Sequence, residues 1–233
     1  MGTLKEGLLG GFSGKVGNIV GVHWNGTYYV RSLPASVKDP KTESQIRQRS
    51  RFSVVMNFLK TITPFIKTGF QSYAIGRRSA FNAAMSYNIR NAVRVGQQGA
   101  ELDWPNVLVS RGTLSTGLGA QTEIEDDGRH SHEGDVLAGH GFHAKVEDGE
   151  LMVEWDAELS GNARGDDIAM LVVYNRTKSQ SVYELNAGKR SYKNAVLQLP
   201  LDWRDDMIES YLAFKTADGS EVSDSVYLGG CKV

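Results

Sequence analysis

The chain has 233 residues, of which 40% are hydrophobic, and its 26 Lys and Arg nearly balance 27 Asp and Glu, for a formal charge of −1. This composition is that of a folded globular chain, and it excludes collagen-like, coiled-coil and intrinsically disordered proteins. The single Cys231 excludes an internal disulfide framework and a thiolate-rich metal site. No apolar run reaches the length of a membrane helix, and the first 21 residues lack the regions of a secretory signal. We therefore expect synthesis in the cytoplasm and no membrane insertion.

The charge is divided unevenly along the chain. Residues 1–100 contain 14 Lys and Arg and 3 Asp and Glu, a net charge of +11, whereas residues 101–233 contain 12 and 24, a net charge of −12. A basic surface attracts nucleic acid, an anionic membrane or the acidic part of a neighbouring copy of the chain. The two halves can also neutralise each other within one molecule.

A β-hairpin is predicted near the N-terminus. Two runs rich in β-branched and aromatic residues, 16–24 and 27–30, flank Asn25-Gly26. Both turn residues tolerate the positive φ angles of a type I′ turn, which makes this dipeptide a strong hairpin indicator. Aromatic rings beside basic residues can stack on nucleic-acid bases, although packing on the protein is the more common use. The candidate interaction residues near the tip are Trp24, Tyr28, Tyr29 and Arg31.

Two helices are predicted after the hairpin. Thr42 and Gln45 have the spacing of a capping box, and apolar residues then recur at helical intervals. Pro64 should end or bend this first helix. A second helix is expected to begin near Ser79 and to stop at Gly96.

The helical region is strongly basic. Lys and Arg occur at nine positions from 47 to 94, and no Asp or Glu occurs between 44 and 100. Phosphate contacts need little beyond such residues on an exposed face, so Arg47, Arg51 and Arg90 are candidate nucleic-acid or protein contacts. No zinc-finger, RNP or helix-turn-helix pattern adds to this prediction. The alternative is a solvated basic face.

The acidic part of the chain has the pattern of an antiparallel β-sandwich. Its strand-like runs, with turn residues between them, are 143–146, 151–155, 168–174, 181–185, 195–199, 209–215 and 221–228. Residues 168–174 are nearly all apolar, which predicts a central strand buried on both faces. Trp155 on an early strand and Tyr211 on a late one resemble the core pair of fibronectin type III domains, a likeness that covers roughly residues 135–233.

The predicted fold class is therefore α+β: an N-terminal β-hairpin and two helices, followed by an Ig-like or fibronectin III-like antiparallel β-sandwich. We expect a basic hairpin and helical region over residues 1–100, an extended linker over 101–135 and a β-sandwich domain over 136–233.

A histidine cluster precedes the sandwich and is the feature most typical of an enzyme. Imidazole and carboxylate groups are good zinc ligands, and the candidates are His130, His132, Glu133 and Asp135. The stretch is rich in glycine and has no helix to fix its geometry, so a solvated loop is the alternative. Phosphate-loop, dinucleotide-binding and nucleophile-elbow motifs are absent from the sequence. We expect no cofactor and no enzymatic activity.

Several ordered stretches carry a resemblance to a known family. They are residues 11–17, 24–34, 39–52, 166–175, 199–203 and 222–229. Over nearly its whole length, the chain resembles a family of uncharacterised proteins from Bacteroidota that share a domain of unknown function. The resemblance implies no activity and no catalytic residues. Asp39-Pro40-Lys41-Thr42, followed by Gln45, Arg49 and Phe52, is also similar to a pattern common in phage-related structural proteins.

The sequence thus favours a non-enzymatic structural or assembly protein, which self-associates as a homo-oligomer or binds a protein partner through its basic half. A virion or a similar particle is one such assembly. The first alternative is a nucleic-acid-binding protein that uses the basic helices. The second alternative is a metal-dependent enzyme at the histidine cluster.

Overall fold

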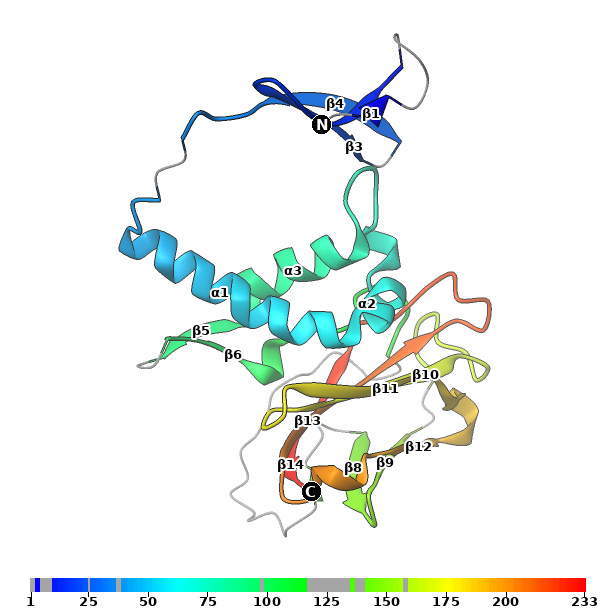
Figure 1. Ribbon diagram of the computed structural model, residues 1–233. Coiled ribbons are helices and arrows are strands. Elements are labelled where there is room, and N and C mark those ends of the chain that lie inside the picture. The colour runs from blue at the N-terminus through cyan, green and yellow to red at the C-terminus, as the bar shows by residue number, and fades with distance from the viewer. Residues whose placement is uncertain are drawn as a thin grey trace. The chain divides into compact units, whose positions relative to one another are not determined.

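The computed structural model divides the chain into two compact units, which we call the N-terminal unit (residues 1–46) and the three-layer unit (residues 47–233) (Figure 1). The structure describes residues 3–4, 10–24, 26–36, 39–96, 99–116, 135–136, 141–156 and 159–233.

The N-terminal unit is an antiparallel sheet in the order β1-β2-β3-β4. Its strands are β1 (Thr3–Leu4), β2 (Phe12–Val16), β3 (Ile19–Trp24) and β4 (Thr27–Ser32). Trp24 pairs with Thr27, so two residues join β3 to β4, and the second of them, Gly26, has a φ of +76°. This confirms the hairpin that Asn-Gly predicts.

The helices begin at the predicted capping residues. The backbone N–H of Thr42 donates to Gln45 Oε1, and the N–H of Gln45 donates to Thr42 Oγ1, both at 3.4 Å, which is the reciprocal pattern of a capping box. Ser79 likewise caps its helix, because its Oγ accepts from the N–H of Asn82 at 3.1 Å. The helices are α1 (Glu43–Leu59), α2 (Thr63–Gly69) and α3 (Ala80–Asn91), with short 3-10 turns η1 (Lys60–Ile62), η2 (Gln71–Tyr73) and η3 (Trp104–Asn106).

Two details of the helical region differ from expectation. The first helix ends at Leu59, before Pro64, and the 3-10 turn η1 follows it. Pro64 itself lies in the first turn of the additional short helix α2, where its missing N–H costs nothing. The predicted stop at Gly96 is wrong, because α3 ends at Asn91. Residues Val93–Gly96 form strand β5, which pairs with β6 (Gly99–Leu102). Alternating valines favour that strand over further helix.

Among the described residues, no helix is long and apolar enough to cross a membrane.

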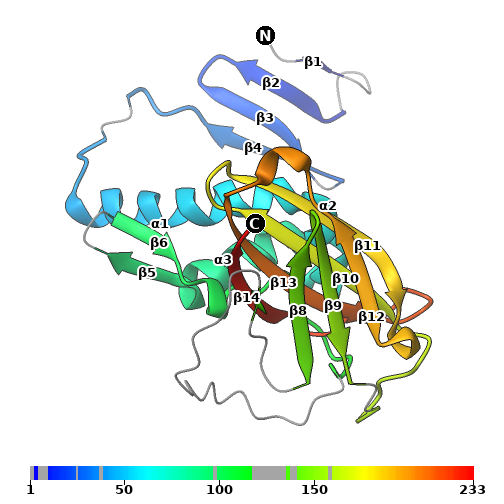
Figure 2. The same ribbon diagram turned by 90° about the horizontal axis from the view of Figure 1, so that it is seen from below.

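Two antiparallel sheets follow, and they lie face to face in Figure 2. We call the first the middle sheet; in spatial order it consists of β11 (Gln180–Lys189), β10 (Ile168–Asn175), β13 (Met207–Lys215) and β14 (Val226–Lys232). The second is the outer sheet, which consists of β12 (Asn194–Gln198), β9 (Glu150–Trp155), β8 (Phe142–Glu147) and β7 (Asp135–Val136). All seven predicted strands contain strand residues, although the last begins only at Val226.

The middle sheet is buried on both faces, as the apolar run predicted. On β10, Met170 and Val172 belong to a core shared with the helices. Their neighbours Leu171 and Val173 belong to a second core, shared with the outer sheet. The three-layer unit is therefore a helix layer, a middle sheet and an outer sheet (Figure 1). This confirms the α+β class, whereas the division at residues 100 and 135 stays a prediction.

The expected core pair of Trp155 and Tyr211 is wrong. Trp155 lies between the two sheets, with its ring centroid 5.4 Å from that of Phe214. Tyr211 points to the other side of the middle sheet, where its hydroxyl donates to the carbonyl oxygen of Trp104 at 2.9 Å. Side chains alternate along β13, so Tyr211 faces the helices and Phe214 faces the outer sheet.

Candidate functional site

The register of the N-terminal sheet sorts its side chains onto two faces, because side chains alternate along a strand and paired residues point the same way. Val20 pairs with both Lys15 and Arg31, and Val22 pairs with Tyr29. We call this side the Trp24 face; it consists of Lys15, Val20, Val22, Trp24, Tyr29 and Arg31. The opposite side, the Tyr28 face, consists of Phe12, Val16, Ile19, His23, Tyr28 and Val30. The four candidates at the hairpin tip are thus divided between two faces.

The Tyr28 face is partly covered by its own aromatic side chains. The rings of Tyr28 and His23 have centroids 4.4 Å apart. A Cβ atom at Gly11 would overlap the ring of Tyr28, and one at Gly21 would overlap the ring of Phe12. The glycines of this segment therefore make room for rings that lie flat on the sheet.

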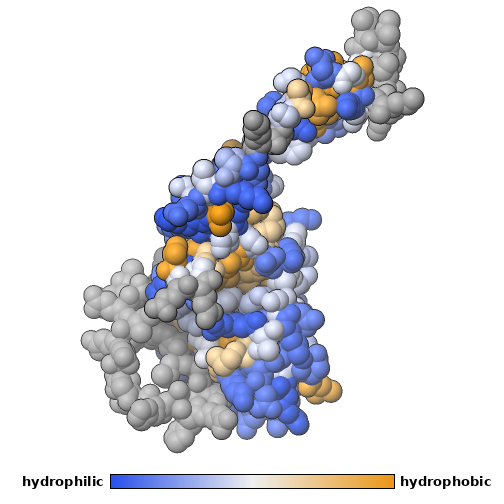
Figure 3. All heavy atoms as spheres, turned by 60° about the vertical axis from the view of Figure 1, so that its left-hand side comes forward, coloured by the Kyte–Doolittle hydropathy of each residue, from blue (hydrophilic) through white to orange (hydrophobic). Residues whose placement is uncertain are grey.

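The Trp24 face is open. Trp24 and Tyr29 are each 46% exposed, and neither ring stacks on another aromatic ring within the described part of the chain. Figure 3 shows hydrophobic atoms, in orange, at the surface of this sheet. Of the residues from 10 to 46 whose burial is described, only Gly21 is buried. The N-terminal unit therefore has exposed aromatic rings but no buried apolar side chain among those residues.

The three candidate arginines have different environments. Arg47 is exposed near the start of α1. Arg51 is partly buried, and its Nη2 donates to the carbonyl oxygen of Ile89 at 3.0 Å, so it joins α1 to α3. Arg90 is exposed, and its guanidinium donates to the carbonyl oxygen and the hydroxyl of Ser86, both at 2.9 Å. Arg51 therefore contacts the backbone of Ile89, the residue before Arg90, and this hydrogen bond links α1 to α3 within the helix layer.

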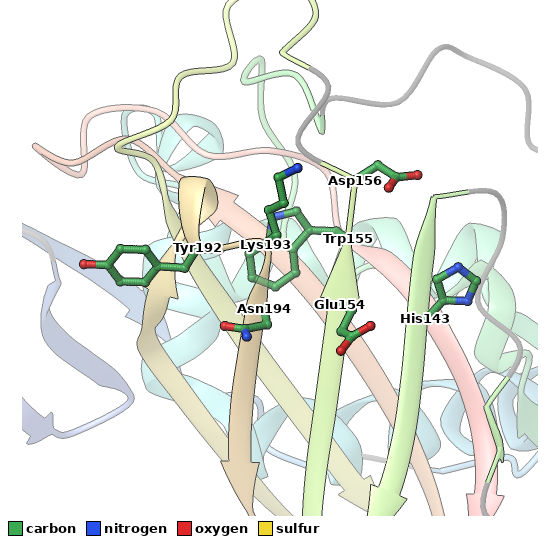
Figure 4. Close-up of a pocket in the computed structure, with 7 residues that line it drawn as sticks. All are labelled: His143, Glu154, Trp155, Asp156, Tyr192, Lys193 and Asn194. Carbon is green, nitrogen blue, oxygen red and sulfur yellow. The ribbon is translucent and has the colours of Figure 1, made fainter.

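An open hollow of about 250 Å³ lies at one end of the outer sheet (Figure 4). Asn194, Glu154 and His143 line it from three neighbouring strands, in one cross-strand row. Tyr192 lies beside this row, and its ring points away from the other labelled side chains. Of these four, only His143 lies near the predicted histidine cluster. Glu154 could have been found from the sequence, since it occupies an outward position of an alternating strand, whereas Tyr192 lies in the 3-10 turn η4 (Arg190–Tyr192).

Two ion pairs stabilise the three-layer unit; both partners of the first are buried, whereas the arginine of the second, Arg176, is 48% exposed. Arg190 and Asp167 are 2% and 1% exposed, and Arg190 Nε lies 3.2 Å from Asp167 Oδ2. Burial lowers the pKa of Arg190, and the neighbouring Asp167 opposes that shift. The same guanidinium donates to the carbonyl oxygens of Thr116 and Ser115, at 2.6 and 2.9 Å. It therefore ties the segment before the outer sheet to the end of the sandwich.

The second pair is formed by Arg176 and Glu209, of which Glu209 is 3% exposed. Its Oε1 lies 3.1 Å from Arg176 Nη1, and its Oε2 accepts from the hydroxyl of Tyr227 at 2.6 Å. Burial and this hydrogen bond raise the pKa of Tyr227. Burial, followed by the charge of Glu209, raises the pKa of Cys231 to about 11. Both groups are neutral at pH 7 with or without these shifts, which extend their neutral forms to higher pH, and their burial favours a packing role.

A comparison with known protein families identifies a match to a family of unknown function, DUF6266, over residues 11–129 and 134–229. The chain belongs to DUF6266. The match begins at Gly11 and includes β2, β3 and β4, so the N-terminal sheet is part of the DUF6266 pattern together with the sandwich. No curated protein matches the chain.

The histidine cluster falls largely outside what the structure describes. His130, His132 and Glu133 lie outside the described residues, and they also lie between the two stretches that match DUF6266. Asp135 begins β7, of which only the backbone is described. Within the described ranges, no three His, Cys, Asp or Glu residues are grouped so as to hold a metal ion. The metal site stays a prediction.

Proposed function

We propose that this DUF6266 protein is a non-enzymatic assembly protein, and that it binds another protein chain through the Trp24 face of its N-terminal sheet. The partner surface that fits is apolar, with acidic residues at its rim, because Trp24 and Tyr29 lie beside Lys15 and Arg31 on that face. Such a contact would join the chains of a homo-oligomer or of a particle such as a virion.

One observation carries the proposal: the N-terminal sheet exposes large aromatic side chains but buries no apolar side chain among its described residues. A small sheet needs a hydrophobic face packed against something else to be stable in water. Exposed apolar patches on folded proteins mark interaction sites. Tyrosine and tryptophan, with arginine, are also the residues most enriched at the centres of protein interfaces.

The proposal is tested on the full chain by mass photometry and sedimentation equilibrium over a wide concentration range, and on complexes isolated from the natural source. We expect species larger than the monomer, which persist at high salt because an apolar contact is not screened. A chain that stays monomeric at every concentration, and that is also monomeric when isolated from its source, contradicts the proposal.

A second candidate, nucleic-acid binding, is favoured by the nine Lys and Arg and the absence of Asp and Glu between residues 44 and 100. It predicts binding to duplex DNA or RNA that weakens steeply with salt. Arg47→Ala and Arg90→Ala, both at exposed positions, should then weaken the binding, whereas Lys189→Ala on the middle sheet should not. No binding at low salt would eliminate this candidate.

Three finer expectations stay predictions. They are the origin in Bacteroidota, the Ig-like or fibronectin III-like strand connectivity of the sandwich, and a metal-dependent activity at the histidine cluster. Stoichiometric zinc in the purified full chain, lost on His132→Ala, would support the last of these.

A further inference from the structure

The helix layer is strongly basic at its surface. Residues 47–102 contain nine Lys and Arg and a single acidic residue, Glu101. All nine basic residues except Arg51 are exposed. Phe52 on α1 is also 45% exposed. The layer thus combines positive charge with an exposed aromatic ring.

The outer sheet is acidic. Residues 135–156 contain six Asp and Glu and one basic residue, Lys145. Register places Val196, Met152 and Lys145 in one cross-strand row of the outward face. Rows containing Glu154 and Glu147 lie on either side of it. Val196, 46% exposed, and Met152 thus form a short apolar strip between two rows that contain glutamates. Lys145 continues this row, and its Nζ lies 2.9 Å from Oε2 of Glu147.

These two surfaces cannot neutralise each other within one chain. The middle sheet lies between them, with one core on each of its faces. Packed layers are about 10 Å apart, so the two outer layers are about 20 Å apart, more than twice the Debye length of about 8 Å at physiological ionic strength. The pair between Arg94 and Asp103, at 2.7 Å, neutralises only one charge at the rim of the helix layer.

We propose that copies of this chain stack head to tail, with the basic helix layer of one copy on the acidic outer sheet of the next. Such a contact joins two different surfaces, so it generates a ring or an open filament rather than a two-fold dimer. Opposite potentials steer the two surfaces together and fix their orientation, while the apolar strip and Phe52 supply the dry centre of the contact. Neither of these two surfaces includes a residue of the Trp24 face.

A second copy fits these charges better than a nucleic acid does. The chain carries its own matching acidic layer, and its total formal charge is −1. A polyanion would be attracted to the basic helix layer, but the acidic outer sheet of the same molecule would repel it. Stacking of copies satisfies both layers at once.

The test uses charge reversal in the full chain. Lys67→Glu/Arg78→Glu reverses two exposed positions of the helix layer, and Glu147→Lys/Glu154→Lys reverses two exposed positions of the outer sheet. Lys189→Glu, an exposed position on β11 of the middle sheet, is the matched control. Circular dichroism and the melting temperature establish that each variant is folded.

Sedimentation velocity is measured at about 10 mM and about 1 M ionic strength, where the Debye lengths are about 30 Å and 3 Å. We expect the wild type and the control to associate at low salt, and each reversed variant to associate at least tenfold more weakly. An equimolar mixture of the two reversed variants should associate again, because the acidified helix layer of one then faces the basic outer sheet of the other.

Three results would overturn the proposal. One is a wild-type chain whose sedimentation is unchanged by salt. Another is a mixture that fails to recover association although both variants are folded. The third is salt-dependent binding of nucleic acid by a chain that does not self-associate. If variants of the Trp24 face lose association while the charge-reversed variants keep it, the stacking proposal is wrong and the proposed function stands.

Discussion

The Trp24 face makes a quantitative prediction through the double variant Trp24→Thr/Tyr29→Thr. Threonine keeps the strand propensity while it removes the rings. Each ring side chain is 46% exposed, and a tyrosine or tryptophan offers about 150–250 Å² in total, so about 70–110 Å² per residue is left for a partner to cover. At about 25 cal/mol per Å², this area corresponds to about 2–3 kcal/mol per residue.

Binding also has costs that area does not include, so we expect the double variant to weaken association by about 2–4 kcal/mol. This is a factor of about 30 to 1,000 in the dissociation constant. The assay is sedimentation equilibrium of the full chain at high salt, where charged contacts are screened. Val30→Thr is the control, because Val30 is 55% exposed on the same strand but belongs to the Tyr28 face.

Two outcomes would contradict an interface on the Trp24 face. If the folded double variant associates as tightly as the wild type, then the Trp24 face is not an interface. If Val30→Thr weakens association as much as the double variant, then the assignment of the contact to one face is wrong.

Three further predictions concern the scaffold. Asn88 is fully buried and makes hydrogen bonds to both backbone groups of Leu108, so Asn88→Ala should lower the free energy of unfolding by about 2–4 kcal/mol, measured by urea titration. Asp167→Ala leaves the buried charge of Arg190 without its partner and should cost about 3–5 kcal/mol. Asp167→Ala/Arg190→Met removes that charge and should restore part of the loss, since the carbonyl oxygens of Ser115 and Thr116 then lose their donor; an equally unstable double variant would contradict this. The Cys231 thiol, whose pKa is raised from 9.0 to about 11, should react with iodoacetamide at pH 8 about a hundredfold more slowly in the folded than in the unfolded chain. The same raised pKa makes the fold lose stability as the pH rises from about 9 to 11, because the unfolded chain releases this proton first.

Local features of the fold could be predicted from the sequence because few residues decide them. The hairpin follows from Asn25-Gly26, the first helix from Thr42 and Gln45, and the central strand from its unbroken apolar run. The three-layer packing could not be predicted, since the apolar stripe of a helix does not specify which sheet covers it. Nor could the burial of Arg190, because its partner Asp167 is 23 residues away and arginine is normally exposed.

The sequence predicted which residues belong to the candidate site, but not how they are arranged on the sheet. The sequence identified Trp24, Tyr28 and Tyr29 as one cluster, whereas alternation along the strands places Tyr28 on the opposite face. The hairpin register already contains that information. For Arg51 no local pattern distinguishes a surface contact from the bond to Ile89 that the packing of α1 on α3 creates.

Photo-crosslinking from the N-terminal sheet shows whether the Trp24 face contacts another protein chain. A benzophenone-bearing amino acid is placed at position 29 or at position 30 of the full chain, in cells that produce the protein naturally, and the products are sized after irradiation. We expect a covalent adduct with another protein chain from position 29 and little or none from position 30. Irradiation that yields only the unmodified chain from both positions would contradict this expectation.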